Sequence, residues 1–349
     1  MTEFEKVTDF ENLYLAFRRS KRGKGYKKSS ARFDMTALDG IHTLRQQLLD
    51  KTYKVSEYQE FKVYEPKERL IQTASFKDKV VQHSLCDNVL MPKLLKIFLP
   101  ENCAGQIGKG TLYGLNLLKE QMEAVYKKYG RKGYILKCDV AKFFYNISHQ
   151  QLKDMVHYWI SDPDVCWLCD LFIDSTEGKG IPLGNQVNQG FALLYLDGMD
   201  KMIRWELGIE YYGRYMDDFY LIHPSKAYLK ECLDVIKSYL NTLGLELNGK
   251  TQIFPVKNGV SYLGFHTYLT PDGTVIRKLK NQNKRNAQRR FKRMAKLVVE
   301  SDLPKKKFLD SYRAWKNHVS HGNCAALERA MDRSVGEIIN CAVEKGGLT

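Results

Sequence analysis

The residues around Asp217 and Asp218 follow the pattern of two short strands joined by a turn. From Tyr211 to Ile222 the chain is aromatic, β-branched or aliphatic on both sides of the two acids, a composition typical of strands. We therefore expect a strand, a tight turn and a second strand, with both carboxylates held at the turn, where they can reach one cation. Aspartate is also an ordinary turn residue. Acids among so many apolar residues are nevertheless rare unless they are paired or bind a metal, so a third carboxylate is expected nearby.

A second apolar strand supplies this third carboxylate. Residues 133–140 have the composition of a strand, and Asp139 stands at its end. An acid in that position needs a partner. The alternative is that Asp139 caps a helix, but Ser148 is the better N-cap for the helical sequence that follows.

The remaining hydrophobic pattern predicts mostly helices. They are expected at 35–49, 76–99, 115–129, 149–173, 191–207 and 225–243, and in basic sequence after about residue 277. The first of them places four apolar residues on one side, Leu38, Ile41, Leu44 and Leu48. Pro92 should kink or split the second. Strands are expected within 58–73 around a turn at 66–68, from about residue 245, and in a second hairpin at 259–265.

Two glycine-rich segments interrupt these elements. The segment 105–110 resembles a phosphate loop only superficially, because it lacks the Walker spacing, and we interpret it as an ordinary turn. The segment 179–190 is a glycine- and amide-rich turn that opens the next helix. Its backbone can approach a planar ligand closely, and its amides can hydrogen-bond bases or sugars.

The charge of the chain is strongly positive and clustered. The 349 residues carry a formal net charge of +15, and the length allows two or three domains. Residues 18–32 include eight basic residues and no acid, and residues 277–296 include ten and again no acid. Such runs suit a phosphate backbone; a solvated helical face or a disordered arm is the alternative.

Other partners are not indicated. No apolar run is long enough to span a membrane and the start is not a secretory signal, so we expect a cytoplasmic protein without a membrane partner. The only C-x-x-C, Cys166 and Cys169, has no second pair at zinc-site spacing. Its apolar surroundings predict a buried helix with reduced, structural thiols.

The order of these motifs resembles that of reverse transcriptases over most of the chain. The resemblance implies an α+β, right-hand polymerase fold, with fingers and palm built from an antiparallel sheet plus helices, and a C-terminal helical thumb. It divides the chain into a basic N-terminal extension (1–35), fingers with part of the palm (36–133), a palm with the metal-binding acids (134–268) and a basic helical thumb (269–349).

The resemblance also assigns catalytic roles. Asp139 looks like the first metal-binding aspartate, and Tyr215-Met216-Asp217-Asp218 looks like the signature hairpin of the family. The implied metal ligands are Asp139, Val140, Asp217 and Asp218, holding two Mg²⁺ ions for which Mn²⁺ can substitute. Lys250 lies where the family has a lysine near the leaving pyrophosphate.

Binding roles follow in the same way. The hairpin 58–73 would close over the triphosphate, although exposed lysines are common on hairpins. The implied dNTP-binding residues are Lys67, Arg69, Phe144 and Gln189, with Phe144 as the gate against a ribose 2′-hydroxyl. The implied template or primer residues are Leu183, Gly184, Tyr215, Met216, Tyr262, Leu263 and Gly264, the last three as the primer-grip turn.

Within the family, residues 64–71, 76–83 and 183–189 resemble the bacterial enzymes of diversity-generating retroelements. Most reverse transcriptases have Gln-Gly and Ser-Pro in the last segment; this chain has Leu183 and Gln189, with Asn188 in place of serine. Defence-associated and group II intron-like enzymes remain open, as does a non-catalytic, maturase-like splicing helper. The implied partners are an RNA template, a DNA or RNA primer, dNTPs, and a structured noncoding RNA or a small accessory protein.

Overall fold

The computed structural model describes residues 1–349 except 65–67, 301–302 and 345–349. Within the described residues the strands form three sheets, with the orders β1-β2, β4-β5-β3-β6 and β7-β8-β9. Their bounds are β1 Gln59–Val63, β2 Arg69–Thr73, β3 Tyr134–Asp139, β4 Tyr211–Tyr215, β5 Asp218–His223, β6 Gln252–Pro255, β7 Val260–Tyr262, β8 Phe265–Leu269 and β9 Val275–Leu279. The pairings β1–β2, β3–β6, β7–β8 and β8–β9 are antiparallel.

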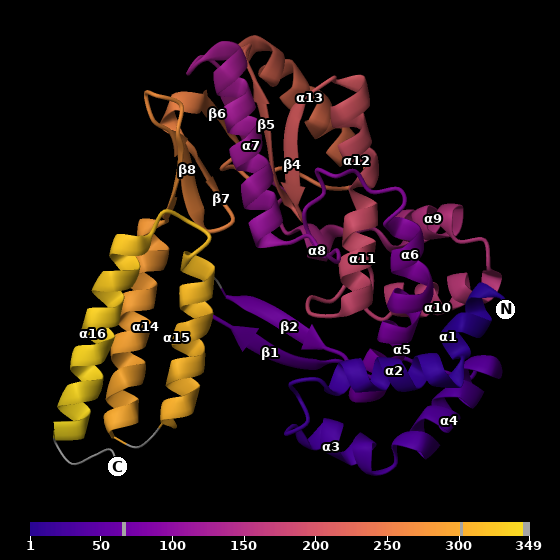
Figure 1. The fold of residues 1–349 in the computed structure, drawn as a ribbon. Coiled ribbons are helices and arrows are strands. Elements are labelled where there is room, and N and C mark those ends of the chain that lie inside the picture. Colours follow the sequence, from indigo (N-terminus) through magenta and orange to yellow (C-terminus); the bar gives the residue numbers. More distant parts are fainter. Residues whose placement is uncertain (65–67, 301–302, 345–349) are drawn as a thin grey trace. The chain divides into compact units, whose positions relative to one another are not determined.

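Helices make up most of the rest of the described chain (Figure 1). The first are α1 Glu3–Thr8, α2 Phe10–Lys21, α3 Lys28–Met35, α4 Ala37–Leu49, α5 Phe76–Leu85, α6 Met91–Leu94 and α7 Thr111–Tyr129. The next are α8 Phe143–Asn146, α9 His149–Trp159, α10 Pro163–Ile173, α11 Gln186–Tyr195, α12 Asp197–Lys201 and α13 Lys226–Thr242. The last are α14 Asn281–Val299, α15 Lys305–Val319 and α16 Ala325–Glu344. Two π-helical turns, Cys86–Leu90 and Met202–Glu206, and a 3₁₀ turn, Val256–Asn258, complete the elements.

The described chain divides into two compact units. Unit 1 comprises Met1–Gly110, Cys138–Tyr220 and Lys230–Thr251. Unit 2 comprises Thr111–Lys137, Leu221–Leu229 and Gln252–Thr349. The division into extension, fingers, palm and thumb made from the sequence stays a prediction.

Helix α11 lies at the centre of unit 1. Phe191, Ala192 and Leu193 are all buried although consecutive residues point to different sides of a helix, which is expected of a helix surrounded by protein. Helices α5, α9 and α12 contact it. This helix begins at Gln186 rather than at Phe191, because the amide-rich residues predicted as a turn already form its first turn.

The N-terminal helices pack on α5 through aromatic side chains. Phe17 of α2 and Phe33 of α3 both contact Phe76, with ring centroids 6.1 and 5.2 Å away. The predicted helix 35–49 is present as α4, but Leu38 is 61% exposed, so its place on the buried side was wrong.

Proline splits the helix predicted at 76–99. Helix α5 ends at Leu85, the π-helical turn Cys86–Leu90 follows, and Pro92 lies in the first turn of α6. Proline has no backbone N–H to donate, so it is tolerated at the start of a helix and not in its interior. The prediction of a kink or split is therefore confirmed.

Three bounds differ from the sequence pattern in the other segments. Helix α7 starts at Thr111, before the predicted residue 115. The segment after residue 245 forms only an isolated bridge, Val140 with Leu247, and strand β6 begins at Gln252. Arg277, assigned to basic helical sequence, lies in β9, where its guanidinium donates to the carbonyl oxygens of Leu115 at 2.5 Å and His321 at 2.7 Å.

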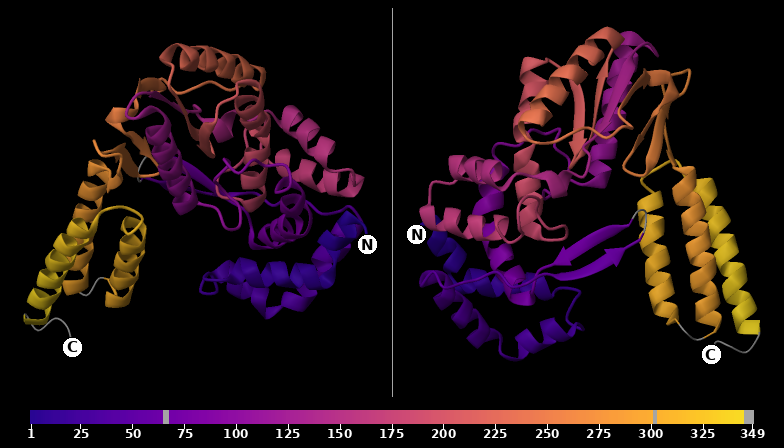
Figure 2. Two further views of the ribbon diagram at one scale, coloured as in Figure 1. Left: turned by 45° about the horizontal axis from the view of Figure 1, so that its top comes forward. Right: turned by 180° about the vertical axis from the view of Figure 1, so that it is seen from behind.

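Unit 2 ends in three helices that lie side by side, α14, α15 and α16 (Figures 1 and 2). One face of α14 is buried through Ala287, Phe291 and Ala295. The Phe291 ring packs edge-on against Phe308, Tyr312 and Trp315 of α15 at 5.2 to 6.2 Å. The basic residues of α14 are thereby left on its exposed side, among them Lys284, Arg285, Arg289, Arg290, Lys292 and Arg293.

The remaining structural predictions concern membranes and thiols. Among the described residues, no helix combines the length and the apolar character needed to cross a membrane. Cys166 and Cys169 lie in α10 as predicted, and both are free thiols. Burial raises the pKa of the Cys169 thiol well above its usual value, which makes it chemically inert.

Candidate active site

The acid hairpin has the predicted form. Strands β4 and β5 are joined by the two-residue turn Met216-Asp217, and Asp218 is the first residue of β5. Met216 has φ of 56°, a left-handed conformation that is uncommon for residues other than glycine. Both acids are half-buried. The apolar strands thus present two adjacent carboxylates at one end of the hairpin.

Asp139 stands beside this turn. It is the last residue of β3, which neighbours β5 in the sheet order. The backbone N–H of Val140 donates to the Asp217 carbonyl oxygen at 3.1 Å. The third carboxylate sought from the sequence is therefore next to the acid turn along the backbone, and it too is half-buried.

Asn248, which the sequence reading did not single out, holds Asp139. Its backbone N–H donates to the Asp139 carbonyl oxygen at 2.7 Å, and its side-chain Nδ2 donates to Asp139 Oδ2 at 3.1 Å. The backbone N–H of Lys250 donates to Asn248 Oδ1 at 3.1 Å, which orients the amide. In the sequence, the only indication of Asn248 was its position two residues before Lys250, to which the resemblance assigns a catalytic role. The Lys250 side chain itself is exposed.

A cavity of about 580 Å³ in unit 1 brings together six of the predicted binding residues. They are Phe144, Leu183, Gly184, Gln189, Tyr215 and Met216. The rest of its lining is Met91, Gly105, Gln106, Ile107, Lys109, Gly110, Gln186 and Gly190. Residues far apart in sequence therefore meet at one hollow that includes the first two residues of the Tyr215-Met216-Asp217-Asp218 motif.

Phe144 is set by a sharp backbone turn after Asp139. Lys142 has φ of 47° and precedes the short helix α8. Phe143 is buried and packs edge-on against Phe144 with ring centroids 5.3 Å apart. The Ile181 N–H donates to the Phe144 carbonyl oxygen at 2.8 Å. The Phe144 ring is thus half-buried and fixed where it lines the cavity.

The segment Leu183-Gly184 is attached to strand β2. The Gln72 N–H donates to the Leu183 carbonyl oxygen at 3.3 Å, and the Ala74 N–H donates to Asn185 Oδ1 at 3.1 Å. Gly184 has φ of 108°, and a Cβ there would lie 3.1 Å from Cγ2 of Ile71. Glycine is therefore required at this position by both conformation and space.

The residues predicted to hold the triphosphate are on the β1–β2 hairpin. Arg69 begins β2 opposite Val63, and its side chain is exposed. Lys67 lies outside the described residues. The pairing of the two strands is confirmed, but none of the described residues of the hairpin lines the cavity.

One wall of the cavity was missed. The segment 105–110, interpreted as an ordinary turn, contributes five of the lining residues. The Lys109 ammonium donates to the carbonyl oxygens of Leu99, Pro100 and Asn102 at 2.9 to 3.3 Å, and burial lowers its pKa. Gly105, Gly108 and Gly110 all have positive φ; these three glycines were the available signal.

The predicted primer-grip residues belong to unit 2. Tyr262 is buried at the end of β7, and Leu263-Gly264 form the two-residue turn into β8. The Gly264 carbonyl oxygen accepts hydrogen bonds from the Lys280 N–H and from Asn283 Nδ2, each at 3.2 Å. The second hairpin is confirmed, and its turn is bound to the start of α14.

The fold is that of the right-hand class of nucleic-acid polymerases. The family model described as reverse transcriptase (RNA-dependent DNA polymerase) matches residues 64–267, more than half of the chain. The chain belongs to the reverse transcriptase family, whose domain is that of an RNA-directed DNA polymerase, a nucleotidyltransferase. No match is found among curated proteins.

Solved telomerase structures share the fold. The structure of apo telomerase from Candida tropicalis, truncated from the C-terminal domain, has a TM-score of 0.50 and 15% identity, covering 68% of this chain and 59% of that one. Telomerase from Candida albicans, in complex with a fragment of telomeric RNA, has a TM-score of 0.51 and 13% identity, covering 82% of this chain and 55% of that one. The chain thus spans between half and two thirds of the length of these relatives. The predicted α+β polymerase fold is confirmed.

Reverse transcriptase domains typically use divalent metal ions. The donor set fits such an ion chemically, because three aspartates offer the oxygen ligands that hard cations prefer. Among the described residues, however, no group of three or more His, Cys, Asp and Glu side chains is close enough to hold a metal. The backbone pairing at Val140 brings two of the acids together, and their role as ligands is a proposal.

Proposed function

We propose that this protein copies an RNA template into cDNA by two-metal nucleotidyl transfer. The single observation that supports this function best is the cavity in unit 1. It combines Phe144, Leu183 and Gly184 with the start of the acid motif, Tyr215-Met216. A polymerase needs this combination, because the incoming nucleotide must meet the template base and the catalytic acids at one place.

Phosphoryl transfer requires position and charge neutralisation more than covalent chemistry from the protein. Asp139, Asp217 and Asp218 would hold two divalent ions, Mg²⁺ with Mn²⁺ as a substitute. When bound, these ions lower the pKa of the primer 3′-hydroxyl and stabilise the departing pyrophosphate. Asn248 keeps the Asp139 carboxylate oriented through its side-chain amide.

The other residues of the site would select and hold the nucleotide. The Phe144 ring would lie against the sugar and exclude a 2′-hydroxyl. Arg69 would neutralise the triphosphate, with Lys67 and Gln189 contributing, and Lys250 would act near the pyrophosphate. Leu183 and Gly184 would contact the template base or the nascent pair, and Tyr262, Leu263 and Gly264 would hold the primer.

The basic surfaces would follow the nucleic-acid backbone. Residues 18–32 lie in α2, α3 and the turn between them, and the basic residues of α14 are on its exposed side. Phosphate contacts give affinity but little sequence choice. Template selection is therefore assigned to RNA structure, a structured noncoding RNA, or a small accessory protein.

Within the family, we place the protein with the bacterial enzymes of diversity-generating retroelements. The support is the likeness of residues 64–71, 76–83 and 183–189, including Leu183 at the cavity. A defence-associated enzyme that makes DNA from a noncoding RNA is the second candidate. A maturase-like, non-catalytic splicing helper is disfavoured by the intact acids, Phe144 and Lys250.

The first test is dNTP incorporation on a primed RNA homopolymer with Mg²⁺ or Mn²⁺. We expect activity in the wild type and none in Asp217→Asn. Asp272→Asn is the matched control, because Asp272 lies in an exposed turn of unit 2 where it bonds only nearby Thr270 and Thr274. Equal incorporation by wild type and Asp217→Asn would contradict the proposal. RNA binding without incorporation, also in the presence of cellular RNA, would favour the splicing helper.

A second test concerns Leu183. An aliphatic side chain at the template base cannot make the polar contacts that glutamine makes, so we expect low fidelity. Leu183→Gln should reduce misincorporation on the same template, measured by sequencing the cDNA. An unchanged error rate would remove Leu183 from the fidelity argument.

A further inference from the structure

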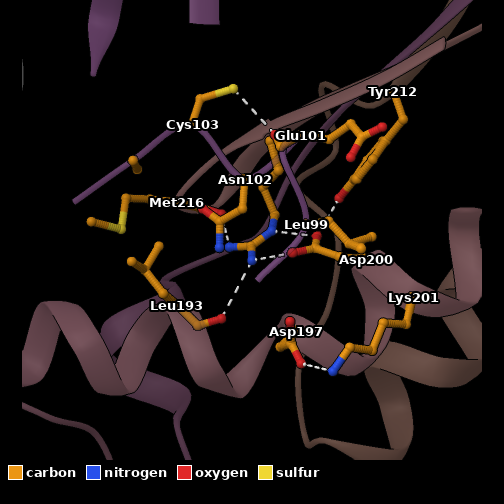
Figure 3. A network of polar contacts seen from close by, with 12 residues as sticks. Leu99, Glu101, Asn102, Cys103, Leu193, Asp197, Asp200, Lys201, Tyr212 and Met216 are labelled. Atoms are coloured by element: carbon orange, nitrogen blue, oxygen red, sulfur yellow. Dashed lines mark hydrogen bonds and ion pairs between the residues drawn. The ribbon is translucent and has the colours of Figure 1, made fainter. Parts of the chain in front are cut away.

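Arg214 is a fully buried charge inside the strand that leads to the acid turn. It lies in β4, directly before Tyr215, with none of its side chain exposed. Its Nε and Nη2 donate to the two carboxylate oxygens of Asp200 at 2.6 and 2.5 Å (Figure 3). Asp200, in helix α12, is equally buried. The two side chains form a bidentate ion pair beneath the hairpin.

The same guanidinium reaches the turn itself. Its Nη1 donates to the Met216 carbonyl oxygen at 3.1 Å, and Nη2 donates to the Leu193 carbonyl oxygen of α11 at 3.3 Å (Figure 3). The Met216 carbonyl belongs to the peptide that continues into Asp217. The arginine plane therefore joins three elements, α11, α12 and the peptide unit that carries the acid.

The backbone of Arg214 attaches the missed wall of the cavity. Its N–H donates to the Glu101 carbonyl oxygen at 2.9 Å, and its carbonyl oxygen accepts from the Cys103 N–H at 2.8 Å. Asn102, between them, accepts from Lys109 and Gln106, which line the cavity. One residue thus holds both the acid turn and the segment that leads to the wall opposite it.

Tyr212 joins the same cluster and interacts with both charged side chains. The Tyr212 hydroxyl donates to Asp200 Oδ1 at 2.5 Å, so that carboxylate oxygen has two donors. Burial alone would lower the pKa of Arg214, but the Asp200 carboxylate more than offsets it and the pKa is raised. Burial, followed by the charge of Asp200, raises the pKa of Tyr212 well above its usual value.

Stability alone does not account for such a pair. The free-energy cost of desolvating two charges can exceed the gain from their attraction. Replacing a buried ion pair with apolar residues of similar volume therefore often leaves a protein equally stable or more stable. Geometry does account for it, because guanidinium is a rigid planar group with five donors. It can bind both oxygens of a carboxylate with one edge and backbone carbonyls with other donors in the same plane. Lysine has three donors but lacks this planar bidentate geometry, and an apolar residue has no donor.

We propose that Arg214 and Asp200 are positioning residues that fix the Met216-Asp217 peptide and the cavity wall relative to each other. This inference rests on the proposed function for its catalytic meaning. Its structural part is that the guanidinium holds the turn in place, and this can be measured without any catalytic activity.

The decisive variant is Asp200→Leu combined with Arg214→Leu, which removes both charges and keeps an apolar volume. We expect cooperative unfolding to be retained, the kcat for dNTP incorporation to fall by about 10²-fold as for small misplacements of a reacting group, and RNA affinity to be unchanged. Arg214→Lys should behave similarly, because it keeps the charge and loses the planar geometry.

A neighbouring ion pair gives the matched control. Lys201 and Asp197 lie on the same helix α12, 2.5 Å apart, with Asp197 buried. Asp197→Leu combined with Lys201→Leu removes an ion pair on the same helix, in which Lys201 donates to Asp197 rather than to the turn. The Asp197 charge also acts on Arg214 and Asp200, so this control keeps the guanidinium geometry and changes only the nearby charge. Its kcat is expected to stay within about twofold of the wild type, since the hydrogen bond to the turn is retained.

Hydrogen–deuterium exchange of the peptide containing Met216 to Phe219, without metal or substrate, separates the two proposals. We expect faster exchange in the Arg214 variants than in wild type and control. Unchanged exchange, or full activity in Arg214→Lys, would overturn the positioning role. Absence of incorporation by the wild type would count against the proposed function alone, since the exchange comparison still decides this inference. If the double variant does not fold, Arg214→Lys carries the same measurement.

Discussion

Two hairpins of this protein, β4–β5 and β7–β8, reverse direction in two residues each, and their turns differ in backbone conformation and in the residue at the second position. The acid turn is Met216-Asp217 and the second turn is Leu263-Gly264. In both, the first turn residue is left-handed, with φ of 56° at Met216 and 46° at Leu263. The second turn continues with Gly264 at φ of 90°, whereas Asp217 of the acid turn does not have positive φ. Two-residue hairpins use both geometries, positive φ at both positions or at the first alone.

The difference lies in what occupies the second position. The second turn uses glycine there, which adopts this backbone without steric cost. The acid turn has Asp217 there, without positive φ, and its carboxylate is one of the proposed metal ligands. A left-handed Met216 costs about 1–2 kcal/mol, and the Arg214 guanidinium on its carbonyl helps to offset this. Both turns therefore have partners outside their own hairpin: Arg214 binds the Met216 carbonyl, and Lys280 and Asn283 bind the Gly264 carbonyl. The second turn has in addition a glycine at its second position.

The largest expected effect on activity comes from placing glycine at the second position of the acid turn, as in the Leu263-Gly264 turn. Asp217→Gly removes the carboxylate at a position where φ is not positive, so glycine relieves no backbone strain there. We expect incorporation to fall by at least about 10²-fold, the usual effect of losing one electrostatic group from a catalytic site. Urea unfolding should change by no more than about 1 kcal/mol. Retained activity would show that Asp217 serves only the turn.

The reverse change tests the second turn. Gly264→Ala places a Cβ at φ of 90°, 3.3 Å from Nδ2 of Asn283. We expect a loss of about 1–2 kcal/mol in the free energy of unfolding, from the steric cost of the left-handed conformation. Gly25→Ala, where φ is not left-handed and the nearest atom is 3.7 Å away, should shift stability by no more than about 0.5 kcal/mol. Equal effects at both sites would refute the argument from conformation.

Glycine at the first turn positions should separate stability from function. Leu263→Gly and Met216→Gly both relieve a strained residue and both add flexibility to the unfolded chain, so each should change stability by less than about 1 kcal/mol. Met216 also lines the cavity. Only Met216→Gly should therefore raise the KM for dNTP in steady-state assays. A raised KM in both variants would show that the cavity contact is not the cause.

The smallest expected effect is a pH dependence near the second turn. His318 packs on Phe265 with ring centroids 5.1 Å apart. Burial, then the charge of His321, lowers the pKa of His318 below its usual 6.5. Between the two values the unfolded chain binds the extra proton, so stability rises with pH through this window and is lost as pH falls through the folded pKa.

We therefore expect the protein to lose stability on acidification from about pH 7 to about pH 5, the range in which histidine titrates. The free energy of unfolding is measured by urea denaturation at several pH values. Amide hydrogen–deuterium exchange in β7–β9 then reports whether the change is local to the second turn. His318→Gln should flatten the profile in that range. The same slope in this variant would assign the effect to another group.

Several parts of this protein follow from local sequence. Alternation and composition over 211–222 determine the acid hairpin, and the apolar strand that ends at Asp139 determines where the third acid falls. Ser148 caps α9, as its position predicted, by accepting from the Gln151 N–H. These features depend on residues close in sequence, so their propensities and spacing are sufficient to specify them.

The tertiary structure decided the rest. Arg214 and Arg277 look like members of a basic chain, but each is buried among partners that sequence does not identify. The wall at 105–110 and Leu183 reach the same cavity from different parts of the fold, whereas Tyr262 to Gly264 belong to the other unit. The physical reason is that periodicity reports which face of an element is apolar. Which distant groups meet a buried charge, and which loops close a cavity, is set by packing between elements.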